Sequence, residues 1–247
     1  MKARLALLAL SCMSPMTAPA VEPITVAWRN KAPYHYMENG VEHGFLLERA
    51  KGLFAAAGVP AVFIEQPSKR IWHSFEQGKQ AYCSIGWYRL PERERLAQFS
   101  LAFHVDPPHL LLVGSAALAT IRSHASFAAL LADNSLTLGV VDGVSYGPAL
   151  DRLIQHSTNR IERATVEPAS MMRMVAANRV AYMLADQADW QYQRSRQHDW
   201  AGIAEYHFND MPPGLERFIV CSKDVSADAM ARLNQAITEL AMPAYSP

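Results

Sequence analysis

The 247-residue sequence has no excess of charge of either sign, only three cysteines and no long hydrophobic run. Basic and acidic residues number 23 each, so a nucleic-acid partner, which requires a basic surface, is not expected. No apolar run approaches the ~20 residues of a membrane span. Low-complexity tracts, heptad repeats and long Pro-, Ser- or Gly-rich linkers are also absent. The length then fits one large domain or two lobes of about 100 residues each.

Signatures of metal sites are missing as well. The nine histidines show no HExxH spacing and the cysteines no CxxC spacing. The Ser-x-x-Lys signature of some hydrolases does not occur either. We therefore expect no metal, no cofactor and a protein that is not an enzyme.

The N-terminus has the pattern of a secretory signal. Basic residues precede the apolar residues 5–10, and APA at residues 18–20 is a small-x-small cleavage site. We expect residues 1–20 to be removed and the mature protein to be periplasmic. Cys12 leaves a lipoprotein alternative open. Removal takes two basic and no acidic residues, which leaves 227 residues with a net charge of −2.

Short β-rich runs alternate with helical periodicity twice along the mature chain, which predicts parallel α/β layers. Strands are expected in the first pass at residues 24–28, 61–65 and 82–85. The second pass predicts strands at residues 136–141, 161–166 and 180–184. The repeated βαβαβ order indicates two facing lobes with a ligand cleft between them.

Two proline-bearing segments flank the second pass, at residues 104–109 and 209–216. Each is followed by an expected strand, at residues 110–113 and 217–221, and Ser226 then caps a final helix. The buried face of that helix is expected to consist of Met230, Leu233, Ile237 and Leu240. Two such crossings fit a hinge pair that returns the chain to the first lobe. We expect lobe 1 to contain residues 21–105 and 215–247, and lobe 2 residues 106–214.

The segment GWYRLPERERLAQFS, residues 86–100, follows an expected strand, and ligands in open α/β sheets bind at strand ends. It resembles the eR-x5-FS signature of family 3 periplasmic solute-binding proteins. The arginine of that signature clamps the ligand's carboxylate, and the match falls on Arg93.

Three further blocks carry the same resemblance. Residues 33–58 look like the family's opening block, which here includes Tyr34, although the usual acid is replaced around residues 46–47. GVVDGVS at residues 139–145 resembles the family's second glycine turn, and AYMLAD at residues 181–186 resembles its D-A-x-x-x-D strand. The resemblance implies a two-lobed α/β type II periplasmic-binding fold, each lobe a βαβαβ sheet flanked by helices and joined by two hinge crossings.

The resemblance also implies roles for three residues. Arg93 offers a rigid fork of donors to a carboxylate, although it could instead be a solvated helix charge. Ser145 lies in a turn that leads into a helix, where free amides favour an anion, and its alternative role is an N-cap. Asp186 would hold an amino group, or else cap the following helix. Tyr146 would close over the site or pack beneath it.

The sequence departs from amino-acid binders on the lobe 1 side. Lys31 and Ser68 stand where such proteins place sandwiching aromatics, and Gly86, Trp87 and Tyr88 replace small hydroxyl residues. Trp87 and Tyr88 would form a stacking platform or a lid, or would pack the lobe. Lys31 would contact the ligand or be an ordinary solubilising charge. The basic character predicts a ligand with a second carboxylate, or one that is not an amino acid.

Two cysteines belong to the mature chain. Cys83 and Cys221 would lie on neighbouring strands if the second crossing leads back to lobe 1. The periplasm permits a disulfide, while buried free thiols are the alternative.

We therefore expect a monomer that captures a small carboxylate-bearing ligand, an amino acid or a relative, by hinge closure and delivers it to an ABC permease. A binding protein that reports to a membrane sensor is one alternative. A dehydratase-like enzyme of the same fold is another. Its acid or base would be Glu65, Glu76 or Asp186, and Lys69 or Arg70 would polarise a carboxylate.

Overall fold

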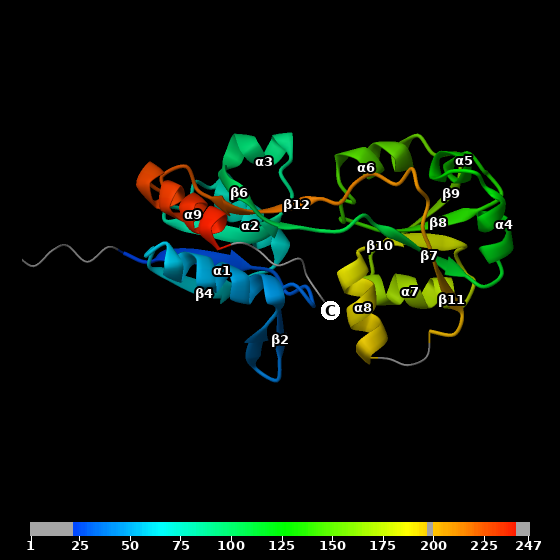
Figure 1. The fold of residues 1–247 in the computed structure, drawn as a ribbon, viewed down its shortest axis with the longest axis horizontal. Helices are drawn as coiled ribbons and strands as arrows, with labels where there is room; N and C mark the ends of the chain where they lie inside the picture. The colour runs from blue at the N-terminus through cyan, green and yellow to red at the C-terminus, as the bar shows by residue number, and fades with distance from the viewer. Residues whose placement is uncertain (1–21, 197–199, 241–247) are drawn as a thin grey trace, which may run out of the picture.

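In the computed structural model, residues 22–196 and 200–240 are described, and they form two lobes that lie side by side along the long axis of the molecule (Figure 1). Each lobe is built on a five-stranded sheet with helices against both faces. Within these residues no helix has the length and hydropathy needed to cross a bilayer. The predicted signal segment and Cys12 lie outside the described residues.

The lobe 1 sheet has the order β4-β1-β5-β12-β6. Its strands are β1 (Ile24–Trp28), β4 (Ala61–Glu65), β5 (Tyr82–Trp87), β6 (Gln98–Val105) and β12 (Glu216–Cys221). The first three in this order are parallel, and β12 is antiparallel to both its neighbours. The helices of this lobe are α1 (Phe45–Ala56), α2 (Ser68–Glu76), α3 (Pro91–Leu96) and α9 (Ala227–Glu239). One face of the sheet packs on α1 and α9, and the other packs on α2.

The lobe 2 sheet repeats this arrangement in the order β9-β8-β10-β7-β11. Its strands are β7 (Leu110–Gly114), β8 (Thr137–Val141), β9 (Arg160–Ala164), β10 (Tyr182–Ala185) and β11 (Ile203–Tyr206). Its helices are α4 (Leu118–Ser123), α5 (Phe127–Leu131), α6 (Pro148–Gln155), α7 (Pro168–Ala176) and α8 (Gln187–Arg196). The central βαβαβ units, β1-α1-β4-α2-β5 and β8-α6-β9-α7-β10, confirm the predicted duplication, because each places its first strand between the other two.

The structure contains one supersecondary element that was not predicted from the sequence. A hairpin of β2 (Tyr36–Glu38) and β3 (Val41–His43) stands before α1. Each of its strands has only three residues, which is too short for a period-two pattern to be recognised. The predicted burial of Leu240 is wrong, because this residue caps α9 and is 45% exposed.

The two segments that join the lobes contact each other. The backbone N–H of Asp106 in the first segment donates to the carbonyl oxygen of Leu215 in the second, at 2.8 Å. A Cβ atom on Gly214 would lie 1.6 Å from the carbonyl oxygen of Asp106, so only glycine fits at this approach. The polypeptide therefore passes twice between the lobes at one place, as a hinge requires.

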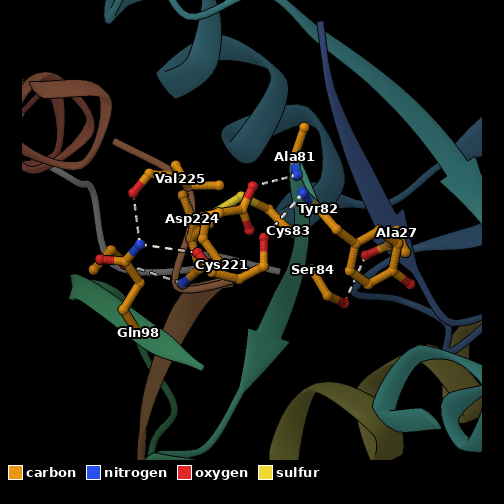
Figure 2. Close-up of a disulfide and its surroundings, with 12 residues drawn as sticks. Ala27, Ala81, Tyr82, Cys83, Ser84, Gln98, Cys221, Asp224 and Val225 are labelled. Atoms are coloured by element: carbon orange, nitrogen blue, oxygen red, sulfur yellow. Dashed lines mark hydrogen bonds between the residues drawn. A yellow bond between two sulfur atoms is a disulfide. The ribbon is translucent and has the colours of Figure 1, made fainter. Parts of the chain in front are cut away.

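A disulfide joins Cys83 of β5 to Cys221 of β12 (Figure 2). The two residues face each other in the antiparallel register, with Cα atoms 4.0 Å apart. Hydrogen bonds surround the bridge: the Gln98 side chain donates to the carbonyl of Val225 at 2.8 Å, and the Ala81 N–H donates to Asp224 at 2.8 Å. The bond ties the returning strand to the centre of the lobe 1 sheet.

Removing this bridge should lower the free energy of unfolding by about 2–5 kcal/mol, because the bond closes a loop with a sequence separation of 138. The test is urea unfolding of the double variant Cys83→Ala/Cys221→Ala, with fully reduced wild-type protein as the matched control. Both should unfold at a lower urea midpoint than oxidised wild type. Equal midpoints for all three proteins would show that the bridge does not form in solution.

Candidate ligand-binding site

A cavity of about 620 Å³ lies between the lobes. Its walls come from the segments that follow the carboxyl ends of the parallel strands of both sheets, the usual ligand position in open α/β sheets. From the set predicted by sequence, it is lined by Lys31, Gly86, Trp87, Tyr88, Arg93, Ser145, Tyr146 and Asp186. Tyr34, also predicted to contact ligand, is 1% exposed and is not among the lining residues. Its ring packs behind the wall, because it lies against the charged groups of Lys31 and Arg217.

Arg93 reaches the cavity from α3. Its Nη1 donates to the carbonyl oxygen of Tyr88 at 2.9 Å, and its guanidinium carbon lies 4.8 Å from the Trp72 ring centroid and 5.0 Å from that of Trp87. Burial lowers the pKa of its guanidinium from the ordinary value. Arg93 forms no ion pair with any carboxylate in the part of the chain that the structure describes. Its remaining donors are therefore available to an anionic ligand.

A second arginine, Arg29, was missed by the sequence analysis. It is the first residue after β1 and lies over the face of Trp87, with its guanidinium carbon 4.2 Å from the ring centroid. Its Nη1 atom is buried without a hydrogen-bond partner among the described residues. Burial, with the nearby charges of Arg217 and Arg93, lowers its pKa to about 10. Its place at the end of a parallel strand was the signal that could have identified it.

Trp87 is the surface on which these two arginines rest. The residue is 6% exposed, its Nε1 donates to the Ser84 hydroxyl at 2.7 Å, and its ring meets that of Trp72 edge to face with centroids 5.0 Å apart. Both guanidinium groups lie within cation–π distance of the ring. Trp87 is thus packed into the cavity wall, where it contacts both arginines, and its role as a stacking platform for a ligand stays a prediction.

Asp186, at the end of β10, is already paired with cations of the protein. Its Oδ2 lies 2.7 Å from Nζ of Lys31 and 3.7 Å from Nη2 of Arg217, and its Oδ1 lies 3.2 Å from Nε2 of His109. Burial opposes ionisation of this carboxyl, but Lys31 and His109 outweigh it and hold the pKa well below the ordinary range. The carboxylate predicted to hold a ligand's amino group therefore holds the Lys31 ammonium instead, across the lobe boundary.

Ser145 also has a partner within the protein. Its hydroxyl donates to Asp151 of α6 at 2.6 Å, and the backbone N–H of Tyr146 donates to the same carboxylate at 2.9 Å. The Tyr146 hydroxyl accepts from the Val141 N–H at 3.2 Å. The donors at this turn are thus satisfied by Asp151, so a carboxylate-binding role of Ser145 stays a prediction that requires displacement of Asp151.

A buried ion pair lies at the hinge, and its arginine, Arg217, lines the cavity. Arg217, 1% exposed, makes two contacts with Asp106, Nε to Oδ1 at 2.9 Å and Nη2 to Oδ2 at 2.7 Å. Its Nη1 donates to the carbonyl of Gly86 at 3.1 Å. The Tyr88 hydroxyl donates to Asp106 at 2.9 Å, so Tyr88 is fixed by this pair. The pair connects the first crossing to β5 and β12, and no role was predicted for either partner from the sequence.

Asp189 on α8 is a carboxyl group of the cavity whose pKa is raised. Its Oδ2 lies 3.1 Å from Nζ of Lys31, while its Oδ1 is buried without a hydrogen-bond partner among the described residues. Burial raises its pKa to about 6, and the negative Asp186 contributes, although Lys31 and Arg217 act in the opposite direction. Because its pKa is higher in the folded state than in the unfolded chain, its ionisation costs stability as the pH rises from about 4 to about 6.

Asp189→Asn should therefore gain stability relative to wild type as the pH rises through that interval. The measurement is the melting temperature of both proteins from pH 4 to pH 7.5. The groups that face Asp189, namely Lys31, Asp186 and Arg217, are common to both proteins, so the difference curve isolates this titration. A difference that is flat with pH, or that falls as the pH rises, would contradict the assignment.

Only some of the residues that would act in the enzyme alternative lie in the cavity. Lys69, Glu76 and Asp186 line the cavity, whereas Glu65 and Arg70 do not. Asp186, ionised and paired, is a poor proton donor. Among the described residues there is no group of three or more His, Cys, Asp or Glu side chains placed to hold a metal ion.

No family model and no curated protein matches the sequence. Solved structures do resemble it. The arginine-, lysine-, histidine-binding protein ArtJ from Geobacillus stearothermophilus is 15% identical, with 88% of each chain covered and a TM-score of 0.67. The periplasmic VFT2 domain of Bordetella pertussis BvgS is 17% identical, with 88% of this chain and 87% of that domain covered and a TM-score of 0.67.

A third similar structure is the ancestral amino acid-binding protein AncCDT-1, a precursor of cyclohexadienyl dehydratase. It is 18% identical, with 87% of this chain and 88% of that chain covered and a TM-score of 0.66. These likenesses show that the chain has the two-lobed periplasmic-binding-protein-like fold. They agree with the resemblance to family 3 solute-binding proteins at the level of the fold.

Proposed function

We propose that this protein is a periplasmic binding protein that captures a small carboxylate-bearing ligand between its lobes and passes it to an ABC permease. The observation that carries the proposal is the partly buried guanidinium of Arg93, which faces the cavity without a carboxylate partner among the described residues. A charged fork of this kind suits a carboxylate bound through two parallel hydrogen bonds.

Contacts across the lobe boundary support capture by closure. Lys31 pairs with Asp186 and Asp189, Arg196 of α8 pairs with Glu38 of the β2–β3 hairpin, and the rings of Tyr36 and Tyr192 meet with centroids 5.5 Å apart. These contacts bring α8 of lobe 2 against lobe 1, while two crossings link the lobes. Rotation about the crossings would break and remake such contacts and so admit a ligand.

An enzyme is the second candidate, and Asp189 is the observation that favours it. A cavity carboxyl whose pKa is about 6 lies nearer to the range of a general acid or base at neutral pH than an ordinary aspartate does. The similarity to a dehydratase precursor is compatible with this candidate.

The two candidates are separated by a thermal-shift screen of ligand-stripped protein against amino acids and organic acids, followed by recovery of each ligand that stabilises the protein. A ligand at about 100 times its Kd should add roughly 2.7 kcal/mol to the free energy of unfolding. Binding predicts that mass spectrometry recovers the ligand unchanged after prolonged incubation. Conversion of the ligand would establish the enzyme, and the absence of any stabilising carboxylate would overturn both candidates.

A further inference from the structure

We propose that the ligand is a small organic acid with two anionic groups and no amino group. The inference rests on the proposed function and names the ligand class of the same cavity. It follows from which charged side chains of the cavity are already paired within the protein and which are not.

The carboxylates at the centre of the cavity are committed to protein cations. Both oxygens of Asp186 have partners, Lys31 on one and His109 on the other, at 2.7 and 3.2 Å. Asp189 shares the same Lys31 ammonium through its Oδ2 at 3.1 Å, whereas its Oδ1 is buried without a hydrogen-bond partner among the described residues. A ligand ammonium at this position would have to displace Lys31, whose side chain is only 23% exposed and lies over the Tyr34 ring. The position that would attract an amino group is thus occupied by one from the chain itself.

The remaining acids of the cavity wall do not replace this position. Glu76 is at the end of α2, where its carboxylate lies 3.6 Å from Nδ1 of His73, and Glu167 immediately precedes α7. His73 and Glu76 side chains are 66% and 55% exposed, so this pair is solvated. A solvated carboxylate attracts an ammonium only weakly.

The arginines show the opposite situation. Arg29 has a buried Nη1 without a partner, and Arg93 donates only to a carbonyl oxygen, so neither guanidinium is neutralised by a carboxylate of the described chain. They lie 4.2 and 5.0 Å from the same Trp87 ring. Burying a charge without a counter-charge is unfavourable, and a ligand that supplies one anion to each guanidinium removes that cost.

An amino group would meet repulsion in this environment. Arg29, Arg93, Lys31 and Arg217 all line the cavity. An amino acid with two carboxylates would bring its ammonium among these four cations, while Asp186 is paired with Lys31 and His109 and Asp189 already shares Lys31. The same carbon skeleton without the amino group avoids this repulsion and keeps both ion pairs.

Two matched pairs of ligands test the inference: succinate against aspartate, and glutarate against glutamate. The members of each pair differ only in the amino group. Isothermal titration of wild-type protein should show at least one amine-free acid binding tenfold or more tightly than its amino counterpart. Tighter binding of the amino acid would overturn the inference and leave the proposed function intact. If none of the four acids binds, the inference is overturned as well, and the wider thermal-shift screen of carboxylates then decides the proposed function.

Two variants assign the effect to the named residues. Lys31→Met, which keeps the aliphatic stem, frees Asp186 from Lys31 and should shift the preference at least tenfold toward the amino acid. Lys51→Met is the matched control and should leave the preference unchanged, because Lys51 is an ion-paired lysine that does not line the cavity. Arg29→Met should weaken succinate binding tenfold or more but leave butyrate, which has one carboxylate, nearly unaffected. An unchanged preference in Lys31→Met, or equal losses for both acids in Arg29→Met, would overturn the assignment.

Discussion

Replacing Arg93 with alanine should weaken ligand binding by one to three orders of magnitude. The loss corresponds to a charge-assisted hydrogen-bonded pair of about 1.5–3 kcal/mol or more, formed in a partly buried cavity. Arg93 rests on Trp72 and Trp87 and holds the Tyr88 carbonyl, so its guanidinium is already oriented before a ligand arrives. Little conformational entropy is then lost on binding.

The measurement is isothermal titration of the tightest ligand from the screen into wild type and variant. Arg93→Lys should recover only part of the loss, because an ammonium keeps the charge but not the fork. Arg95→Ala is the matched control, since Arg95 is an exposed arginine of the same short helix that does not line the cavity. Unchanged affinity in Arg93→Ala would remove Arg93 from the site.

Replacing Asp106 with alanine should lower the free energy of unfolding by about 3–5 kcal/mol. The change leaves Arg217 buried without its main counter-charge, and breaking a buried pair from one side typically costs this much. It also removes the acceptor of the Tyr88 hydroxyl. Because the pair joins the first crossing to β5 and β12, the variant should lose cavity geometry as well as stability.

A double-mutant cycle with Arg217→Met separates the pair from its surroundings. Methionine fills much of the space without a charge, so Asp106→Ala/Arg217→Met should be more stable than the sum of the two single losses predicts. Urea unfolding of the four proteins gives the coupling. Strict additivity would show that the two side chains do not stabilise the protein as a pair.

Local sequence patterns predicted most of the strands and helices of the fold. Residues 24–28 and 61–65 were expected as strands and are β1 and β4, and Ser226 caps α9 by accepting the Ala229 N–H at 3.2 Å. Such elements carry their signal in adjacent residues, through periodicity and capping. The β2–β3 hairpin carries no such signal, because its strands are too short to alternate visibly.

Long-range pairings in the site could not be predicted in this way. Lys31 was singled out as a basic departure, but its partner Asp186 is 155 residues away and meets it only when the lobes face each other. Arg217 likewise depends on the crossings lying side by side, which is a property of the tertiary fold. The cavity-lining position of Arg93 was predicted from a motif and not from periodicity. The sequence of α3 alone, with its alternating charges, is typical of a solvated helix.

A crystal structure of the protein with its tightest ligand would show whether an anionic ligand binds between the lobes on Arg93. We expect a ligand carboxylate in the inter-lobe cavity with oxygens about 2.7–2.9 Å from the Arg93 guanidinium. We also expect the Lys31–Asp186 pair to persist beside the ligand. A ligand bound outside the cavity, or one whose ammonium replaces Lys31 on Asp186, would contradict this mode of binding.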